Sequence, residues 1–289
     1  MAAAPRPASI EEAREDYDRT SLQWVGEAEE VAEVSEVEVD PICVRLYRPE
    51  DARGALLWIH GGGWIMGNLT SYDPLCRALA NRTGALVASV DYRLAPESPF
   101  PGPVEDCEVA LRWLAEHCAG EPLAIGGDSA GGNLATVVAR RARDSGGPEL
   151  CFQLLAYPAT DAACATGSMQ TYGSDASFGL GRDEMETCWA AYAPGAAARS
   201  PDTSPLRAAD LSNLPPAYFV LAECDPLTDE ATDYADRLRA AGVPAEVEVW
   251  PGMIHGFLRF RAGVDTAHEA LDAAAARARA ALDGAVVGS

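Results

Sequence analysis

The sequence has 289 residues, 48% of them hydrophobic and 23% charged, which is enough chain for one large domain with a substantial core. Its net charge of −22 argues against nucleic acid as a partner, because nucleic acid is itself anionic. All 22 basic residues are arginine, a bias that codon usage in a GC-rich genome or adaptation to high salt would each produce.

The N-terminus has no apolar core of signal-peptide length, and no later stretch approaches the ~20 apolar residues of a membrane span. We therefore expect a cytoplasmic protein with no membrane partner. The eight cysteines form neither a C-x-x-C pair nor a spacing typical of metal ligands. In a reducing compartment they are expected to be packed thiols, Cys224 included, and no metal or cofactor site is expected.

The first elements in chain order are a helix and a hairpin. Residues 9–34 are acidic and helix-like, with Trp24 as an aromatic anchor. Residues 37–49 then alternate polar and apolar positions around Asp40 and Pro41, which is typical of two strands joined by a turn.

From residue 54 onward, short apolar runs alternate with amphipathic segments. Strands are expected near 54–60, 84–92, 122–127 and 150–158, with helices near 73–83, 103–118 and 133–144. This alternation predicts an α/β fold, in which helices cover both faces of a parallel sheet.

The alternation stops between about Asp161 and Pro205. This polar region contains one helix-like segment, 182–193, in which Trp189 and Tyr192 could be buried, so we expect a lid here. Strands near 217–223 and 245–250 then follow, with helices near 229–242 and from about Thr266.

The sequence GGDSAGG, residues 126–132, joins an apolar strand to a helix. It lacks the lysine of a phosphate-binding loop and the glycine spacing of a dinucleotide loop, but it matches G-x-S-x-G at every position. Such a nucleophile elbow needs glycine at 127 and 131 because neighbouring backbone crowds both positions. Ser129 is the expected nucleophile, and the Ala130 N–H would face a developing oxyanion. An ordinary strand-to-helix turn is the alternative interpretation.

A serine nucleophile needs a base and an orienting carboxylate, in the chain order Ser, Asp or Glu, His. His255 lies in a glycine-flanked loop directly after a predicted strand, where α/β sites are built, whereas His268 lies in a helical pattern. Asp225 ends its predicted strand and is the expected acid. Glu223 and Asp229 are fallback candidates, although Asp229 is expected to cap the next helix.

A second glycine-rich motif follows the first buried strand. The run of Gly61, Gly62 and Gly63 after His60 lets backbone N–H groups approach a carbonyl oxygen, so it is expected to supply the second half of an oxyanion hole. A flexible turn would be the alternative, but two such motifs in this order favour catalysis.

The motifs HGGGW, DYRLAPE, GDSAGG, AECDPLTDE and MIHGF occur in that order, and with them the chain closely resembles the hormone-sensitive-lipase-like carboxylesterases, bacterial branch included. The resemblance covers about residues 39–261. It implies an α/β-hydrolase fold, with a mostly parallel eight-stranded sheet flanked by helices and a helical cap.

The resemblance also implies functional roles by position. Ser129, Asp225 and His255 would form the catalytic triad. Gly61, Gly62 and Ala130 would supply the oxyanion hole. His60 would shape the glycine loop without taking a proton, and Asp128 would help to hold the elbow. Trp64 differs from the residue often found after the glycine run, and we expect it to narrow the pocket.

The expected organisation is an N-terminal cap segment (1–38), an α/β-hydrolase core in two parts (39–164 and 205–289) and a cap insert (165–204). The expected activity is that of a serine carboxylesterase acting on short- to medium-chain acyl esters, with no cofactor. A deacylase or acyltransferase with the same triad, acting on a specialised metabolite, is the first alternative, and a non-catalytic small-molecule receptor is the second. The resemblance also implies that a homodimer could form, through an outer strand such as residues 245–250 or its adjoining helix.

Overall fold

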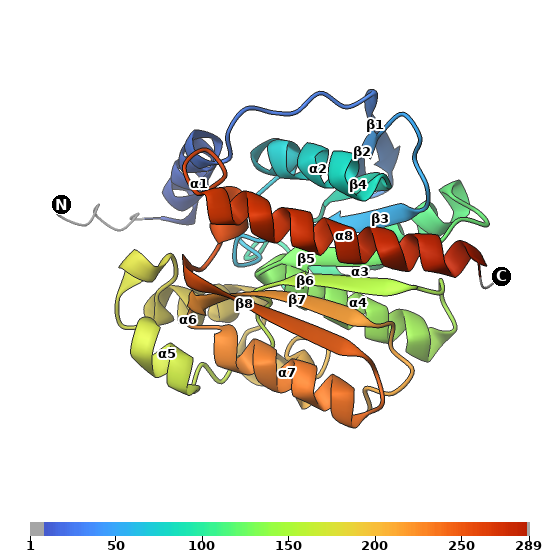
Figure 1. The fold of residues 1–289 in the computed structure, drawn as a ribbon. Helices are drawn as coiled ribbons and strands as arrows, with labels where there is room; N and C mark the ends of the chain where they lie inside the picture. The colour runs from blue at the N-terminus through green and yellow to red at the C-terminus, as the bar shows by residue number, and fades with distance from the viewer. Residues whose placement is uncertain (1–8, 288–289) are drawn as a thin grey trace.

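The computed structural model describes residues 9–287, which are built around one eight-stranded sheet with the order β1-β2-β4-β3-β5-β6-β7-β8 (Figure 1). β2 pairs antiparallel with β1 and β4, and every other pairing is parallel. The strands are β1 (Glu33–Val39), β2 (Ile42–Arg48), β3 (Ala55–Ile59), β4 (Leu86–Asp91), β5 (Leu123–Asp128), β6 (Phe152–Ala156), β7 (Ala217–Cys224) and β8 (Ala245–Ile254). The predicted fold class, a mostly parallel α/β sheet, is confirmed.

Helices connect most of the strands. The α-helices are α1 (Ile10–Trp24), α2 (Leu69–Thr83), α3 (Gly102–His117), α4 (Ala130–Ser145), α5 (Gly167–Tyr172), α6 (Arg182–Tyr192), α7 (Thr228–Ala240) and α8 (Asp265–Val287). Short 3-10 helices are η1 (Ala176–Phe178), η2 (Gly195–Arg199), η3 (Pro205–Arg207) and η4 (Phe257–Arg259).

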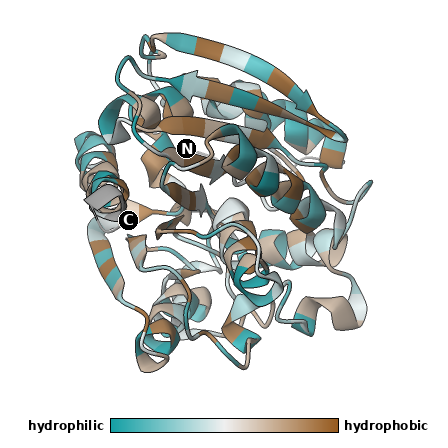
Figure 2. Ribbon diagram, turned by 90° about the vertical axis from the view of Figure 1, so that its right-hand side faces the viewer, coloured by the Kyte–Doolittle hydropathy of each residue, from teal (hydrophilic) through white to brown (hydrophobic). Residues whose placement is uncertain are grey.

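Both faces of the sheet are covered. Helices α2 and α8 pack on one face, and α3, α4 and α7 pack on the other (Figure 1). Every residue of β3 and of β5 is buried, which is why these strands are apolar runs without alternation. The outermost strand β1 is partly exposed and alternates hydrophilic and hydrophobic residues along its length (Figure 2).

Helix α1 and the insert between β6 and β7 lie at the same end of the sheet (Figure 1). The insert contains more structure than its sequence predicted, because α5, η1 and η2 accompany the expected helix α6. Helix α5 has only six residues, which is too short to leave a helical period in the sequence. It is held instead by Asp229, whose carboxylate accepts a hydrogen bond from the Ser168 N–H at 2.7 Å.

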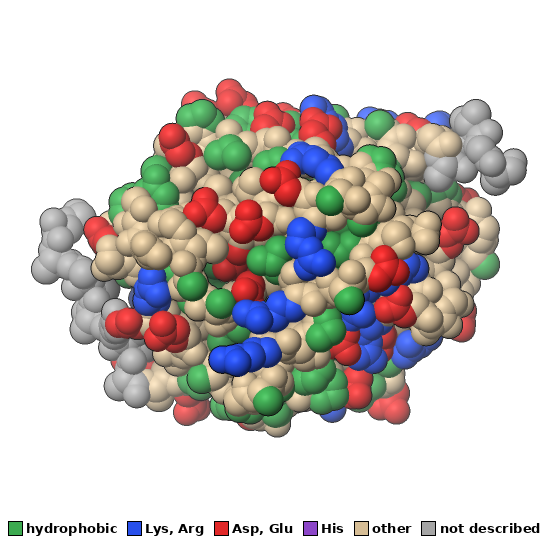
Figure 3. All heavy atoms as spheres, turned by 90° about the horizontal axis from the view of Figure 1, so that it is seen from below, with side chains coloured by type: hydrophobic (Ala, Val, Ile, Leu, Met, Phe, Trp, Pro, Cys, Tyr) green, Lys and Arg blue, Asp and Glu red, His purple; other side chains and the backbone are tan. Residues whose placement is uncertain are grey.

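The surface mixes charges despite the large negative total. On the face seen from below, arginine side chains lie among aspartates and glutamates (Figure 3). Within residues 9–287, no helix combines the length and hydropathy needed to cross a membrane. All eight cysteines are free thiols.

Candidate active site

The strand-to-helix turn between β5 and α4 places Ser129 on a strained backbone. Its φ of 54° and ψ of −120° lie outside the regions that L-residues prefer, as a nucleophile elbow requires. A Cβ on Gly127 would lie 2.5 Å from the Ile59 carbonyl oxygen, and a Cβ on Gly131 would collide with the same carbonyl. The two glycines therefore let α4 turn directly against β3, as the G-x-S-x-G motif predicted.

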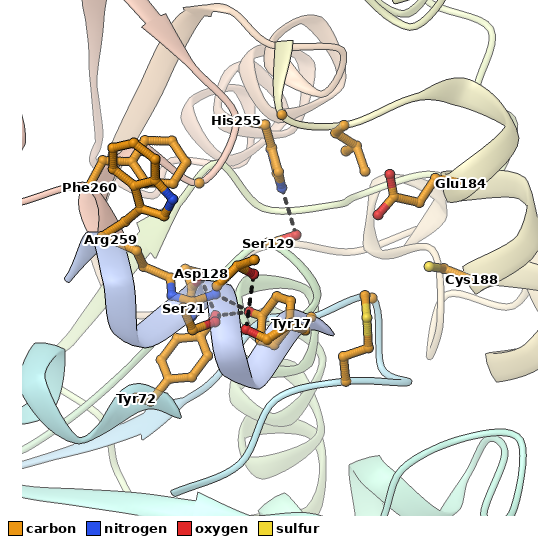
Figure 4. A pocket seen from close by; sticks show the side chains of 18 of the residues that line it. Tyr17, Ser21, Tyr72, Asp128, Ser129, Glu184, Cys188, His255, Arg259 and Phe260 are labelled. Atoms are coloured by element: carbon orange, nitrogen blue, oxygen red, sulfur yellow. Dashed lines mark hydrogen bonds between the residues drawn. The ribbon is translucent and has the colours of Figure 1, made fainter. Parts of the chain in front are cut away.

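Three side chains from distant parts of the sequence meet at this turn. The Nε2 atom of His255 lies 2.9 Å from Ser129 Oγ (Figure 4). Its Nδ1 atom lies 2.8 Å from Asp225 Oδ2. The other carboxylate oxygen of Asp225 accepts a hydrogen bond from the Leu227 N–H at 2.8 Å, which fixes its orientation. This is the hydrogen-bond sequence of a nucleophile, a base and an orienting acid.

Glu223 and Asp229, the two alternative candidates for the acid, make other contacts. Glu223 is exposed and accepts a hydrogen bond from the Gly252 N–H. Asp229 does not cap α7, contrary to expectation. Its carboxylate binds the start of α5 instead, because the insert packs against the first turn of α7.

Burial and charge act in opposite directions on His255. Burial favours the neutral imidazole, but the carboxylate of Asp225 attracts and hydrogen bonds the protonated ring, so the pKa of His255 is raised overall. Asp225 is completely buried and His255 is 8% exposed, so this attraction acts in a poorly solvated place. The insert also touches the base, since the His255 N–H donates to the Phe178 carbonyl of η1.

The glycine loop corrects one expectation. The N–H of Gly61 donates to Asp128 Oδ1 at 3.1 Å and to the Tyr72 hydroxyl at 3.0 Å, so it cannot serve an oxyanion. Gly62 and Gly63, with φ of 108° and 61°, both line the cavity at Ser129. Their N–H groups donate to no acceptor among residues 9–287, and neither does that of Ala130 at the start of α4. The three available donors are therefore those of Gly62, Gly63 and Ala130.

Ser129 and His255 open onto a cavity of about 260 Å³. Residues of α1, of the glycine loop, of the insert and of the turn after β8 form its wall. These are Tyr17, Thr20, Ser21, Trp24, Gly62, Gly63, Met66, Tyr72, Asp128, Gly179, Leu180, Glu184, Met185, Cys188, Gly256, Arg259 and Phe260. Figure 4 shows Glu184 and Cys188 on one side of Ser129, and Tyr17, Tyr72 and Arg259 on the other.

Trp64 does not narrow this cavity. Its ring is fully buried and stacks on Tyr192 and Trp189 of α6, with centroids 4.5 Å and 4.3 Å away. The positive φ of Trp64, 62°, turns the side chain toward the insert. Met66, two residues further along, lines the cavity, whereas Trp64 does not.

Two of the other histidines make structural contacts. His60 is fully buried with its Nδ1 atom 2.8 Å from the Gly61 carbonyl oxygen, and burial lowers its pKa to about 4. His268 on α8 contacts the Arg261 carbonyl. No cluster of three or more His, Cys, Asp or Glu side chains suited to a metal ion occurs in the described part of the chain.

The chain matches a family model described as alpha/beta hydrolase fold over residues 56–259. Carboxylesterase NlhH of Mycobacterium tuberculosis is 45% identical over 253 residues, which cover 83% of this chain and 79% of that protein. Ethyl acetate hydrolase of Pseudomonas putida is 39% identical over 280 residues, covering 90% and 87%. The solved structure of a hyperthermophilic esterase from the archaeon Pyrobaculum calidifontis superposes with a TM-score of 0.91 at 39% identity, covering 94% of each chain.

The chain therefore belongs to the alpha/beta hydrolase fold family. Its resemblance to the hormone-sensitive-lipase-like carboxylesterases is confirmed by relatives and structural neighbours that are esterases. The roles implied by the resemblance named Gly61 and Gly62 but left out Gly63, although the glycine run contains it. Sequence reasoning missed Tyr17, Tyr72 and Arg259, which carry no pattern and come together only in the fold.

Proposed function

We propose that this protein is a serine carboxylesterase that hydrolyses short- to medium-chain acyl esters through an acyl-enzyme on Ser129. The observation that carries the proposal is the continuous pair of hydrogen bonds from Ser129 through His255 to Asp225, beside three unpaired backbone donors. The carboxylesterase and ethyl acetate hydrolase named above support ester hydrolysis as the reaction.

In the first half-reaction, Ser129 Oγ attacks the ester carbonyl carbon while His255 Nε2 accepts the hydroxyl proton. Asp225 holds the ring and stabilises the imidazolium that forms. The negative oxygen of the tetrahedral intermediate is bound by the N–H groups of Gly62, Gly63 and Ala130. His255 then donates its proton to the leaving alcohol, and the acyl group stays on Ser129.

In the second half-reaction, water takes the place of the alcohol. His255 accepts a proton from the water, whose oxygen attacks the acyl carbon, and the same backbone donors bind the second oxyanion. Collapse of this intermediate releases the carboxylic acid and returns the proton to Ser129 Oγ. The ester and one water molecule are the reactants, and the residues named above supply the nucleophile, the base and the oxyanion donors.

The size of the cavity supports small substrates. Pockets for drug-sized ligands are about 300–1,000 Å³, whereas this one is about 260 Å³. We also propose that α1 and the insert (165–204) together form the cap, because both contribute to the cavity wall. The N-terminal cap segment ends before Glu33 and not at residue 38, because β1 belongs to the sheet. Residues 1–8 of that segment lie outside the described residues.

The test is hydrolysis of p-nitrophenyl esters from acetate to palmitate by the parent protein and by Ser129→Ala. We expect activity that is highest for short chains and lost in the variant. The parent is also treated with a serine-directed phosphonate. Mass spectrometry then gives the fraction of protein with a reactive serine, independently of ester hydrolysis. Labelling of the parent without hydrolysis of any ester would contradict the proposed substrate range, and failure of both reactions would contradict a serine nucleophile.

Acyl transfer by the same triad differs only in the acceptor that replaces water. Product analysis in the presence of added alcohol or amine distinguishes the two. A non-catalytic receptor is disfavoured by the assembled triad.

A homodimer through β8 stays a prediction. This strand ends the sheet, and Val249 on it is 44% exposed. Sedimentation velocity on the parent and on Val249→Arg tests it, since a charge on this edge should dissociate such a dimer.

A further inference from the structure

A buried arginine lies in the wall of the cavity without a carboxylate in contact. Arg259 of η4 is 8% exposed, and it forms no ion pair within residues 9–287. Its guanidinium lies over the ring of Tyr17 at 4.6 Å and over the ring of Tyr72 at 4.5 Å. One nitrogen, Nη1, donates to the Tyr17 hydroxyl, while Nε and Nη2 have no hydrogen-bond partner among the described residues.

Burying a cation in this way is costly unless its charge is compensated. The two aromatic faces supply part of the compensation, since each attracts a guanidinium. The other part comes from the buried carboxylate of Asp128. Burial raises the pKa of Asp128, and the charge of Arg259 opposes that rise by stabilising the ionised form.

Hydrogen bonds join the cation to this carboxylate. The Tyr17 hydroxyl lies 3.0 Å from the Tyr72 hydroxyl, which donates to Asp128 Oδ2 at 2.8 Å. The Asp128 Oδ1 atom accepts from the Gly61 N–H at 3.1 Å. Five groups from α1, α2, the elbow, the glycine loop and the turn after β8 thus form one connected set, and Figure 4 shows its side chains together beside Ser129.

These connected groups reach both parts of the oxyanion hole, the glycine loop and the start of α4. Asp128 directly precedes Ser129 and Ala130, and Gly61 directly precedes Gly62 and Gly63. The bond between Asp128 and Gly61 therefore sets how far the donors of the glycine loop lie from the donor at the start of α4. Because a misplacement of ~1 Å can cost about 10²-fold in rate, a loosened bond would be visible in turnover.

We propose that Arg259 and Tyr17 are positioning residues that hold Tyr72 and Asp128 in place, so that docking of α1 completes the oxyanion hole. Arg259 is the buried counter-ion of Asp128. The Tyr17 hydroxyl accepts a hydrogen bond from Arg259 and forms another with the Tyr72 hydroxyl, so it links the two side chains. The cap helix thereby contributes to catalysis as well as to the wall of the cavity. This inference rests on the proposed esterase function.

The test compares Tyr17→Phe, Arg259→Met and Arg259→Lys, with kcat expressed per phosphonate-titrated site so that unfolded protein does not count. Tyr17→Phe keeps the ring under the guanidinium and removes only the hydroxyl. We expect kcat to fall about tenfold in Tyr17→Phe and about 10²-fold in Arg259→Met, with KM nearly unchanged. Arg259→Lys keeps the charge and should recover part of the loss.

A trifluoromethyl ketone, which forms a tetrahedral oxyanion adduct with the serine, provides the second measurement. Its inhibition constant should rise in proportion to the loss of kcat/KM, because the adduct uses the same donors as the transition state. Tyr47→Phe is the matched control. It also removes a hydroxyl that donates to a carboxylate, Asp73, and its ring also faces an arginine, Arg77, but it lies outside the cavity.

Unchanged kcat per titrated site in Tyr17→Phe would overturn the proposal, even if Arg259→Met failed to fold. A rise in KM alone, with inhibitor affinity preserved, would equally overturn it and leave both residues as parts of the wall. Failure of the proposed function is seen separately, as a parent protein that hydrolyses no ester.

Discussion

Trp64 of the glycine loop stacks on Tyr192 of α6, with ring centroids 4.5 Å apart and ring planes 6° from parallel. Since Gly62 and Gly63 directly precede Trp64, this contact joins the oxyanion loop to the insert. Trp189 packs on the same tryptophan at 4.3 Å, so α6 presents two aromatic rings to it. The insert is therefore attached to the glycine loop that it covers. Its sequence is rich in small and polar residues, and Trp189 and Tyr192 supply the large side chains that hold it in place.

Replacing this tryptophan should destabilise the protein. Trp64→Ala removes a completely buried ring and leaves a cavity, for which we expect a loss of ~3–5 kcal/mol in the free energy of unfolding. Urea denaturation measures it. The control is Leu22→Ala, at a position that is 52% exposed, which should change the stability by less than ~0.5 kcal/mol. Equal stability of the two variants would show that the aromatic contact does not hold the insert.

The pH dependence of kcat/KM should show how Asp225 acts on His255. His255 must be neutral to accept the proton, so kcat/KM should rise as the pH rises through its pKa, which Asp225 raises above the ordinary value. In Asp225→Asn the attraction is lost while burial remains. The rising limb should therefore move to lower pH. We expect kcat to fall by about 10⁴-fold, because the amide favours the wrong tautomer of the imidazole and does not stabilise the imidazolium.

A limb that stays at the same pH in Asp225→Asn would assign the titration to another group. Glu223→Gln is the comparison, since this carboxylate is exposed and belongs to the same segment. We expect its profile to match that of the parent.

The glycine loop allows a matched test of the oxyanion donors. In Gly62→Ala the new Cβ would collide with the Met66 carbonyl at a φ of 108°, so the loop must shift and its donors with it. We expect kcat per titrated site to fall by about 10²-fold or more. Gly120→Ala is the control, because its φ is also positive, 89°, but the new Cβ has no neighbour within 4 Å. It should lose ~1 kcal/mol of stability through backbone strain and keep its turnover.

The cavity wall should set the preferred chain length. Met185 of α6 is buried and lines the cavity, so Met185→Ala should move the optimum toward longer chains. The measurement uses two series, p-nitrophenyl esters of growing acyl chain and acetate esters of growing alcohol, because either side of the ester can face α6. Met169→Ala removes an equally buried side chain outside the cavity and should leave both optima in place. An unchanged optimum in both series for Met185→Ala would place the substrate elsewhere.

Sequence patterns were informative wherever the chemistry constrains neighbouring residues. The buried strands appeared as apolar runs, and G-x-S-x-G marked the elbow because glycine is the only residue that fits at positions 127 and 131. The boundary of α2 was less visible. The helix begins at Leu69, before Pro74, because Asn68 and Ser71 form a capping box at its start.

Tertiary structure decided what the individual glycines do. Gly61 and Gly62 are equivalent in sequence, yet Asp128 and Tyr72 occupy the N–H of Gly61, and the donors are those of Gly62 and Gly63. Trp64 likewise turned away from the cavity because α6 offers it two aromatic partners. Neither outcome is encoded in local spacing, since the first depends on Asp128, 67 positions from Gly61, and the second depends on residues of α6.

The sequence by itself determined the fold class, the elbow and the order of Ser129, Asp225 and His255, because those features depend on local backbone constraints and on the ends of strands. Only the tertiary structure brought Tyr17, Tyr72 and Arg259 together beside Asp128, and only it showed which backbone donors are free. The physical reason is that a buried charge is compensated by whatever groups the fold brings into contact with it, and those groups need no pattern along the chain.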